Sequence, residues 1–195
     1  VVTSVLPWGL PGTMETGTAE QEDGTALAAE NRAAVSRVYT LRNGTLTALY
    51  EEGRIRDGQE SRIARIAAWN GDACFVRTLD TGAVWELVKL EQGTAQILYR
   101  GTLSDGETVT GLSAANDRAW LTTVGENGAS VYEYTTDGGF GLKLLMPPTG
   151  NWEPAAAEYD GQRLRSTTVY GDTCFVAADG TCTYTKEAAE PEPPT

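Results

Sequence analysis

The sequence predicts an all-β fold, a partial or small β-propeller made of four-stranded antiparallel blades. Turn residues recur throughout, since 22 glycines are spread along the chain and glycine enters tight turns without steric penalty. Valine, threonine and aromatic residues fill the segments between the turns, as strands prefer. A blade-like unit also recurs about every 46 residues, within the range of known propeller repeats.

Two landmarks mark this repeat. A Val-aromatic pair recurs at offsets of 46 and 47 residues, at Val38-Tyr39, Val84-Trp85 and Val131-Tyr132. The second landmark is a turn followed by Asp, a small residue, Cys and Phe, at residues 69–76 and again at 169–176, with a related segment at 115–121. We interpret the second landmark as the turn between the first two strands of successive units.

Turn signals divide each unit into four short strands. Asn-Gly and Asp-Gly between alternating segments are the strongest short-range hairpin signals, as at Asn70-Gly71. In the two best copies the expected strands are 62–69, 73–79, 83–90 and 95–100, then 107–115, 118–124, 129–135 and 140–146. Four antiparallel strands per unit of this length are typical of a propeller blade.

The end units are incomplete in this pattern. The first shows two late strands, 36–42 and 45–50, and the last shows early strands near 163–170, 173–178 and 181–186. A ring that closes one blade with strands from both termini has such a split, but about three blades is below the usual minimum of four. Either strands are missing from this piece, or two copies complete a ring together. The alternative fold is a β-sandwich or meander.

Composition divides the chain into three parts. Residues 1–34 are an N-terminal segment or linker, in which 13–31 are acidic and poor in large apolar side chains, with one or two helical turns expected from Ala26 to Val35. Residues 35–186 carry the propeller-like blades. Residues 187–195 are rich in Pro and Glu and are expected to lead to a neighbouring domain of a longer protein.

Charge and residue usage exclude several functions. The net charge of −12 repels phosphate backbones and anionic lipid, so neither nucleic acid nor membrane binding is expected. The chain has no histidine, which removes Ser-His-Asp and Cys-His catalysis and histidine metal sites. The acidic composition, poor in cysteine, suits a secreted or cell-envelope bacterial protein, so we expect an extracellular or envelope location.

The three cysteines form no C-x-x-C pair, so no zinc or other metal site is expected. Cys174 and Cys182 are close enough in sequence to meet in a hairpin and form a disulfide. With a two-residue turn at 179–180, however, Cys174 faces Thr185 and Cys182 faces Ala177. We therefore expect free, buried cysteines that act as small hydrophobic residues.

Residues 75–86, FVRTLDTGAVWE, resemble the repeat of quinoprotein-type propellers, which has an apolar strand, an aspartate, then Thr-Gly, two residues and Trp. In the next unit Gly128 and Tyr132 replace the Gly and Trp, so one blade carries the detailed match. The resemblance implies a quinoprotein-like propeller, a class that includes cofactor-bearing dehydrogenases and cofactor-free scaffolds of the bacterial envelope. The charged and metal-binding residues of the cofactor-bearing members cannot be mapped here, so no cofactor is expected.

Two candidate catalytic patterns are better explained as turns. Residues 80–83, Asp-Thr-Gly-Ala, match an aspartic-protease signature, but they align with hairpin turns of the neighbouring units. Asp105 and Glu107, with Asp57, could form an acidic pair for glycoside hydrolysis or a calcium site, although charge clusters in loops usually only meet solvent. We therefore assign no catalytic residue.

Aromatic residues on the expected strands should fill the space between blades: Trp69, Trp85, Trp120, Tyr132 and Phe175. Trp152 differs, because it lies in 147–162, the longest expected connection between units. There its ring could stack on a sugar or peptide, or instead fasten the loop to a blade.

One face of the expected propeller carries the loops between blades together with the loops between second and third strands. It would be mainly acidic with a small basic edge, which suits a cationic or neutral polar partner. The candidate binding residues are Arg54, Arg56, Asp57, Asp80, Asp105, Glu107, Glu126, Asn127, Trp152, Glu153 and Asp179.

These observations favour a non-catalytic module that binds a protein or a polar small-molecule or carbohydrate ligand, or that serves as a scaffold. It would act beside a fused domain or as a homo-oligomer. The alternative is a propeller enzyme, either a quinoprotein-like oxidoreductase or one that acts on glycosides. A third hypothesis is a structural piece that assembles by edge-strand pairing.

Overall fold

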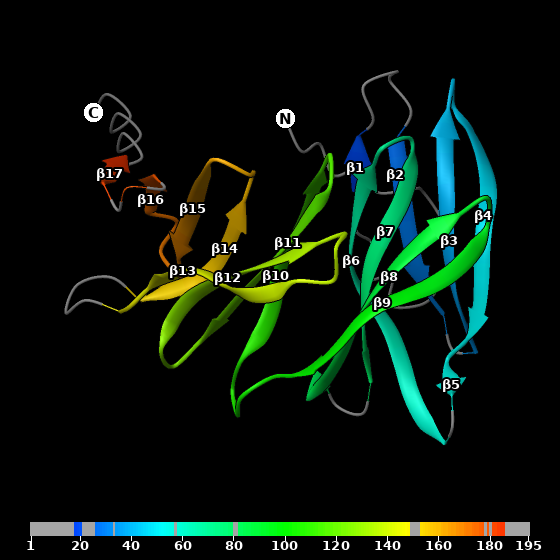
Figure 1. Cartoon of the computed structure of the whole chain (residues 1–195), viewed down its shortest axis with the longest axis horizontal. Coiled ribbons are helices and arrows are strands. Elements are labelled where there is room, and N and C mark those ends of the chain that lie inside the picture. The colour runs from blue at the N-terminus through cyan, green and yellow to red at the C-terminus, as the bar shows by residue number, and fades with distance from the viewer. Residues whose placement is uncertain are drawn as a thin grey trace, which may run out of the picture.

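Four antiparallel sheets follow one another along the chain in the computed structural model, which describes residues 18–20, 26–32, 34–56, 58–79, 82–148, 153–177, 179 and 181–185. In Figure 1 the first sheet, coloured blue to cyan, lies in the right half of the view, and the brown and red strands β15–β17 of the last sheet lie at the left. Successive four-stranded antiparallel sheets of this kind are β-propeller blades. The predicted fold class is therefore confirmed.

Each blade is a meander in which every strand pairs with its neighbour in sequence. Blade 1 contains β1 (Thr18–Glu20), β2 (Ala26–Asn31), β3 (Val35–Arg42) and β4 (Thr45–Gly53). Blade 2 contains β5 (Ile55–Arg56), β6 (Gln59–Trp69), β7 (Asp72–Leu79), β8 (Val84–Glu91) and β9 (Thr94–Thr102). Blade 3 contains β10 (Thr108–Ala115), β11 (Arg118–Gly125), β12 (Gly128–Thr135) and β13 (Phe140–Met146). Blade 4 contains β14 (Pro154–Tyr159), β15 (Arg163–Thr168), β16 (Thr173–Ala177) and β17 (Cys182–Thr185).

A tight turn between β6 and β7 sets the register of blade 2. Asn70 and Gly71 both have positive φ, 51° and 83°, as the preferred two-residue hairpin turn requires. Trp69 consequently pairs with Asp72, and Ala67 with Cys74. Because neighbouring residues of a strand point to opposite faces, this register gives both faces of the blade a set of apolar side chains.

Apolar clusters between the blades form the core. One cluster joins blades 1 and 2, a second joins blades 2 and 3, and a third joins blades 3 and 4. Trp69, Trp85 and Trp120 are buried between blades, as the sequence predicts. Phe175 is different, because it is half-buried beneath the guanidinium of Arg163, 4.6 Å from the ring centroid.

Hydrogen bonds join β6, β10 and β14, which are equivalent strands of successive blades. Arg65 Nε of β6 donates to the Thr110 carbonyl of β10 (2.8 Å), and the Thr110 hydroxyl donates to the Ala157 carbonyl of β14 (2.7 Å). Trp69 Nε1 likewise donates to the Asn116 carbonyl of the next blade (2.9 Å). Spacings of 45 and 47 residues between these partners show that the sequence repeat is a repeat of blades.

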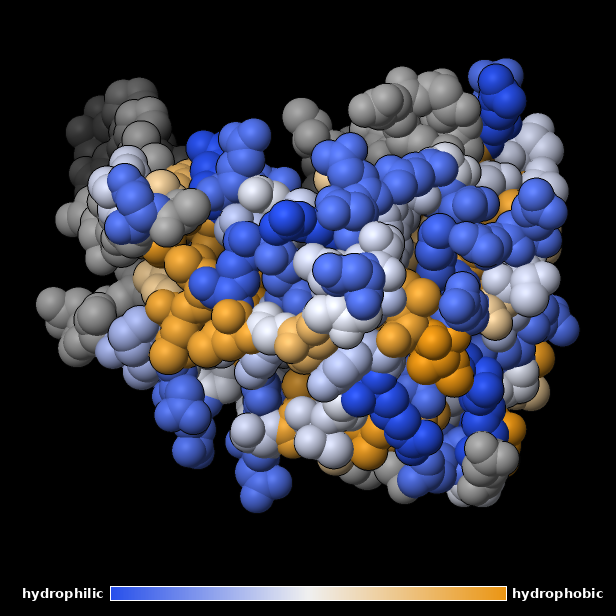
Figure 2. All heavy atoms as spheres, in the orientation of Figure 1, coloured by the Kyte–Doolittle hydropathy of each residue, from blue (hydrophilic) through white to orange (hydrophobic). Residues whose placement is uncertain are grey.

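The outermost strands carry irregularities that protect their free edges. The pairings of β4, β9 and β13 each contain a register shift, at Val38/Tyr39, Leu87/Val88 and Val131/Tyr132. Exposed apolar side chains on these strands form patches separated by charged side chains on the face in Figure 2. Bulges on edge strands discourage pairing with another chain, which argues against assembly through these three edges.

The ends of the chain differ from the sequence prediction. The helical turns expected from Ala26 to Val35 are wrong, because β2 and the start of β3 occupy this segment, and blade 1 has four strands. Blade 4 also has four strands, since β14 lies within the expected connection 147–162. The first and last blades lie at opposite ends of the molecule (Figure 1), so the described strands form four blades and no blade is shared between the termini.

The match between residues 69–76 and 169–176 is also wrong as a structural equivalence. Cys74 lies on β7, the second strand of its blade counted from β6, whereas Cys174 lies on β16, the third strand of blade 4. Asn116 and Asp117, between β10 and β11, are the true counterpart of Asn70 and Gly71.

Two of the three cysteines, Cys74 and Cys174, are buried, as the sequence predicts. The expected register near Cys182 is wrong by one residue, since Cys174 pairs with Tyr184 and Cys182 with Val176, and the Cys182 side chain lies outside the described part. Segments 1–17 and 186–195 also lie outside it, and no helix within the described ranges is long and apolar enough to cross a membrane.

Alkaline pH is expected to destabilise the fold through Cys74. Burial raises the pKa of its thiol from 9.0 to about 12, while the Ala67 backbone and the Lys89 charge act weakly in the opposite direction. Between these values the unfolded thiol ionises and the folded thiol does not, so unfolding releases a proton. The free energy of unfolding should fall as pH rises above about 9, by at most about 1.4 kcal/mol per pH unit from this group. Denaturant unfolding at several alkaline pH values measures the slope, and Cys74→Ala should reduce it; an equal slope in both proteins would contradict the assignment.

Candidate functional site

Loops between blades and loops between second and third strands lie on one edge of the molecule, because strand directions alternate within each meander. We call this edge the loop edge; its described residues fall within 32–34, 54–58, 82–83, 103–107, 126–127, 147–153 and 169–172. The predicted site residues found on it are Arg54, Arg56, Asp105, Glu107, Glu126, Asn127 and Glu153.

The remaining predicted site residues do not join them in the described structure. Asp179 is a wrong prediction, because it lies between β16 and β17 at the opposite edge. Asp57, Asp80 and Trp152 lie outside the described residues. Tyr170, 89% exposed in the β15–β16 turn, occupies the loop edge of blade 4 and was missed because the strands of that blade were counted from the wrong start.

Arg54 is a structural residue rather than a free binding group. Its side chain is mostly buried, donates to the carbonyls of Arg32 (2.9 Å) and Ser61 (3.3 Å), and pairs with Glu60. These contacts fasten the β4–β6 connection to the neighbouring strands. The sequence correctly places Arg54 at the edge, but its guanidinium is already engaged.

Glu107 organises the loop between blades 2 and 3. Its carboxylate accepts hydrogen bonds from the Ser104 N–H (3.0 Å) and from the hydroxyl of the buried Thr123. The Glu107 N–H in turn donates to the Ser104 carbonyl (3.0 Å). Asp105 is exposed in the same loop, so only Glu107 of the two carboxylates is held in a fixed position.

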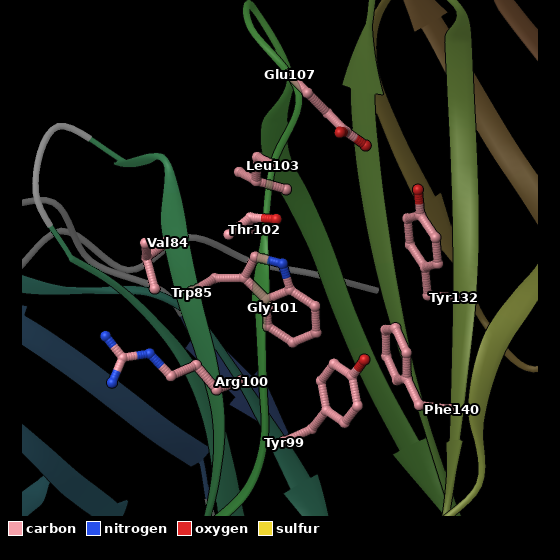
Figure 3. Close-up of a pocket in the computed structure, with 10 residues that line it drawn as sticks. All are labelled: Val84, Trp85, Tyr99, Arg100, Gly101, Thr102, Leu103, Glu107, Tyr132 and Phe140. Atoms are coloured by element: carbon pink, nitrogen blue, oxygen red, sulfur yellow. The ribbon is translucent and has the colours of Figure 1, made fainter.

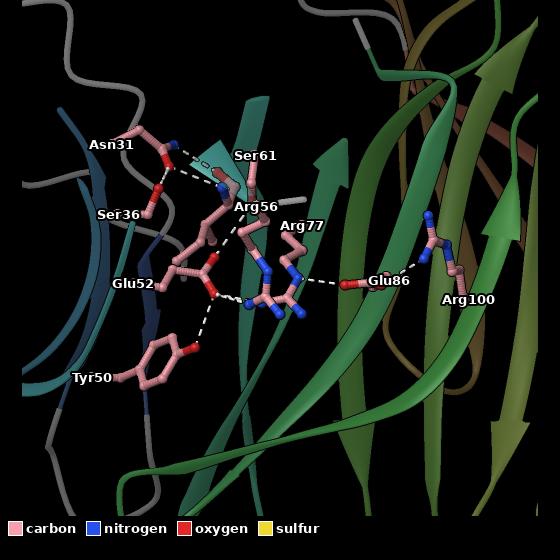
Figure 4. Close-up of polar contacts among 10 residues, drawn as sticks. Asn31, Ser36, Tyr50, Glu52, Arg56, Ser61, Arg77, Glu86 and Arg100 are labelled. Atoms are coloured by element: carbon pink, nitrogen blue, oxygen red, sulfur yellow. Dashed lines mark hydrogen bonds and ion pairs between the residues drawn. The ribbon is translucent and has the colours of Figure 1, made fainter. Parts of the chain in front are cut away.

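A buried ion network crosses the interface between blades 1 and 2 (Figure 4). Arg77, only 1% exposed, pairs through Nη1 with Glu52 and through Nε with Glu86 at 2.6 Å. Burial acts to lower the pKa of Arg77, but the charges and hydrogen bonds of the two glutamates outweigh it, and the pKa is raised. Arg77 is therefore held in its charged form.

Further polar groups satisfy the same carboxylates. Glu52 also accepts from the Tyr50 hydroxyl (2.9 Å) and Arg56 Nη1 (3.0 Å), and Arg100 Nη1 lies 3.6 Å from Glu86. The network thus runs from the loop edge to β9, with Arg56 and Arg100 at its more exposed ends.

A pocket of about 450 Å³ lies between blades 2 and 3 and reaches the loop edge at Leu103 and Glu107 (Figure 3). Its lining comes from β8, β9, the following loop, β12 and β13: Val84, Trp85, Tyr99, Arg100, Gly101, Thr102, Leu103, Glu107, Tyr132 and Phe140. Four aromatic rings form one wall. Tyr99 stacks on Phe140 with ring centroids 4.0 Å apart, and Trp85 lies 5.4 Å from Phe140.

Gly101 makes room for the indole of Trp85. The two residues are cross-strand partners in β8 and β9. A Cβ added at Gly101 would lie 2.7 Å from two ring carbons of Trp85, closer than real contacts allow. Glycine is required here for space, since its φ is not positive.

Several polar atoms border the pocket. In Figure 3 the indole nitrogen of Trp85, the hydroxyls of Tyr99 and Tyr132 and the carboxylate of Glu107 lie around it, whereas the Arg100 side chain points away from the rings. Burial, followed by the charge of Glu107, raises the pKa of Tyr132. The pocket therefore combines apolar ring surface with hydrogen-bonding groups and a negative charge.

No group of three or more His, Cys, Asp or Glu side chains that could hold a metal ion occurs in the part of the chain that the structure describes. No protein-family model matches the sequence, and the search of curated proteins finds no match.

Solved structures of similar fold are nevertheless found. A streptogramin B lyase matches with a TM-score of 0.59 and 18% identity, over 93% of this chain and 57% of the lyase. Virginiamycin B lyase from Staphylococcus aureus matches with a TM-score of 0.54 and 18% identity, over 89% of this chain and 56% of the enzyme. An exo-β-1,3-galactanase from Phanerochaete chrysosporium matches with a TM-score of 0.53 and 12% identity, over 88% and 52%.

These likenesses support the propeller fold alone, because all of the identities are low. The chain spans little more than half the length of these proteins. The finer resemblance to quinoprotein-type repeats is not among these matches, and it remains an expectation from residues 75–86.

Removal of the Arg77 charge should strongly destabilise the protein. Arg77→Met would leave Glu52 and Glu86 buried without their shared cation, which costs about 3–5 kcal/mol for a broken buried pair. The matched control is Arg37→Met, which breaks an ion pair with the exposed Glu51 and should cost much less, because solvent screens exposed pairs. Urea unfolding measures both; equal losses in the two variants would contradict the importance of the network.

Gly101→Ala should disturb the pocket wall without changing any polar group. The new methyl would displace the Trp85 indole, and overpacking of this kind costs about 1–3 kcal/mol. Gly141→Ala in β13 is the control, since a Cβ there meets no atom within 4 Å and the change should stay within about 0.5 kcal/mol. Thermal unfolding followed by tryptophan fluorescence would detect the difference, and an unaltered emission spectrum in Gly101→Ala would refute the close contact.

Proposed function

We propose that this chain is a non-catalytic binding module of a secreted or cell-envelope protein, and that it takes a polar ligand or a partner at its loop edge. The observation that carries the proposal is the pocket of about 450 Å³ between blades 2 and 3, which meets the loop edge at Glu107. Sites for small ligands are commonly clefts of this size, lined by aromatic groups with a few convergent polar atoms.

The charge of the site supports a neutral or cationic ligand. The whole chain carries a net charge of −12, and Glu107 borders the pocket. Arg100 points away from the rings (Figure 3) and pairs with Glu86 (Figure 4). An anionic ligand would meet Glu107 without a cation directed into the pocket to offset it.

Binding can be mapped by ¹H–¹⁵N NMR on the labelled chain, with neutral glycosides, short basic peptides and a dinucleotide as three ligand classes. We expect saturable shifts from glycosides or peptides, concentrated in residues 99–107 and 126–132, and none from the dinucleotide. Shifts centred on the opposite edge, at 43–44, 92–93 and 136–138, would refute the location. Chemical conversion of a glycoside during the titration would favour the alternative enzyme, and an absence of binding by all classes would overturn the proposal.

A further inference from the structure

We propose that the pocket between blades 2 and 3 is a carbohydrate site for one neutral pyranose ring, with Trp85 and Tyr99 as hydrogen-bond donors and Glu107 as acceptor. This inference rests on the proposed binding function and assigns it a ligand class. It follows from unused hydrogen-bonding groups, from the acceptor opposite them and from the apolar wall.

The indole N–H of Trp85 has no acceptor among the described residues. The residue is only 3% exposed, and its Nε1–H faces the pocket in Figure 3. The other buried indoles differ: Trp69 Nε1 donates to the Asn116 carbonyl at 2.9 Å, and Trp120 Nε1 donates to Glu133 at 2.7 Å. In the described part of the chain, the only fully buried side-chain polar atom without a partner is Thr122 Oγ1, so the Trp85 N–H is open to the pocket. A ligand in the pocket can therefore supply its acceptor.

Tyr99 carries a second unused group. Its hydroxyl makes no hydrogen bond to any residue in the described ranges and points toward the pocket (Figure 3). Two other tyrosine hydroxyls are engaged instead: Tyr50 donates to Glu52 at 2.9 Å, and Tyr159 donates to the Gly161 carbonyl at 3.1 Å. The ring of Tyr99 is fixed by stacking on Phe140, so its hydroxyl is held in place for a ligand.

Glu107 supplies an acceptor on another side of the pocket. Contacts with Ser104 and Thr123 hold its carboxylate in place. A carboxylate has about four acceptor positions, and these two contacts leave capacity for ligand hydroxyls. Donors and an acceptor around one space suit sugar hydroxyls, each of which both donates and accepts.

The polar groups and the negative charge of the pocket disfavour the two main alternative ligands, a quaternary ammonium ion and an anion. Apolar C–H faces of a sugar ring can contact the edges of Trp85, Tyr99 and Phe140. A quaternary ammonium would leave the donors of Trp85 and Tyr99 unpaired, although rings and a carboxylate otherwise attract cations. An anion would meet Glu107. A neutral polyhydroxylated ring carries both the acceptors that Trp85 and Tyr99 need and the donors that Glu107 needs.

The test uses the full chain and the indole N–H signals of its tryptophans, with Trp85→Phe to assign the signal of Trp85. The probes are methyl β-glucopyranoside, methyl β-galactopyranoside and methyl α-mannopyranoside at millimolar concentrations, with tetramethylammonium as the cationic competitor. At least one glycoside should shift the Trp85 signal saturably and leave those of Trp69 and Trp120 unchanged. A shift of the Trp85 signal by tetramethylammonium alone would overturn the inference.

Tyr99→Phe removes one hydroxyl and keeps the stacked ring. It should weaken binding of the responding glycoside about five- to tenfold, as expected for one hydrogen bond, whereas Tyr159→Phe, outside the pocket, should not change it. Unchanged affinity in Tyr99→Phe would overturn the assignment. Shifts at 126–127 or 169–172 without a shift at Trp85 would overturn the carbohydrate pocket but keep the loop edge as a binding site. Failure of glycosides, peptides and the cation to bind anywhere would overturn the proposed function as well.

Discussion

Face-to-face packing of the sheets is the interaction on which the whole structure depends. A four-stranded sheet with apolar side chains on both faces needs a neighbour on each side. Blade 2 shows this most clearly: Phe75 is buried against blade 1, while Cys74 and Val76 are buried against blade 3. Strands β7 and β8 therefore have nearly continuous burial instead of the alternation of a half-exposed sheet. Each blade is stable because its neighbours cover it.

The two interfaces of blade 2 use different chemistry. The interface with blade 3 is aromatic, with Trp69 against Tyr134 at 6.2 Å. The interface with blade 1 contains Arg77 between two glutamates. Buried ions add little net stability compared with apolar side chains, but breaking one pair is costly. A shift of one residue in register would move Arg77 to the opposite face of the sheet and leave Glu52 and Glu86 without it, so the network disfavours that register.

Local signals predicted the middle of the molecule well. The strands expected at 62–100 and 107–146 correspond to β6–β9 and β10–β13. There the turn residues and the β-branched residues favour the same hairpins that the tertiary structure requires. The prediction failed where local propensity and tertiary context disagree. β2 has the sequence ALAAEN and β14 has PAAAEY, and Ala and Glu favour helices in isolation. Neighbouring sheets override that preference by burying Leu27 and Ala29 of β2 and Ala157 and Tyr159 of β14.

The same error displaced one candidate site residue. The sequence pattern does not reveal β14, so it makes residue 163 the start of the first strand of the last blade. That count puts Asp179 between the second and third strands, on the loop edge, where the structure has the β15–β16 turn. The landmark at 169–176 reinforced this error, since a Gly-Asp turn followed by a small residue, Cys and Phe suits any tight β-turn before a buried strand. Turn residues therefore predict that a hairpin is present. They do not predict which two strands of a blade the hairpin joins, because that depends on how many strands precede it.

The pocket residues were visible in the sequence but were assigned a different role. Trp85 and Tyr132 belong to the repeated Val-aromatic pair and were expected to fill the space between blades. The structure agrees on their location but shows that the filling is incomplete toward the loop edge. Gly101 explains why: a side chain there would displace the Trp85 indole from its place beside Tyr99 and Phe140. Because Gly101 has no side chain, the Trp85 indole can lie flat beside it with its N–H directed into the pocket. This role of Gly101 is recognisable only once the register pairs it with Trp85. The geometry of this pocket therefore arises from the register of β8 and β9. A sequence pattern that treats each strand separately does not contain that register.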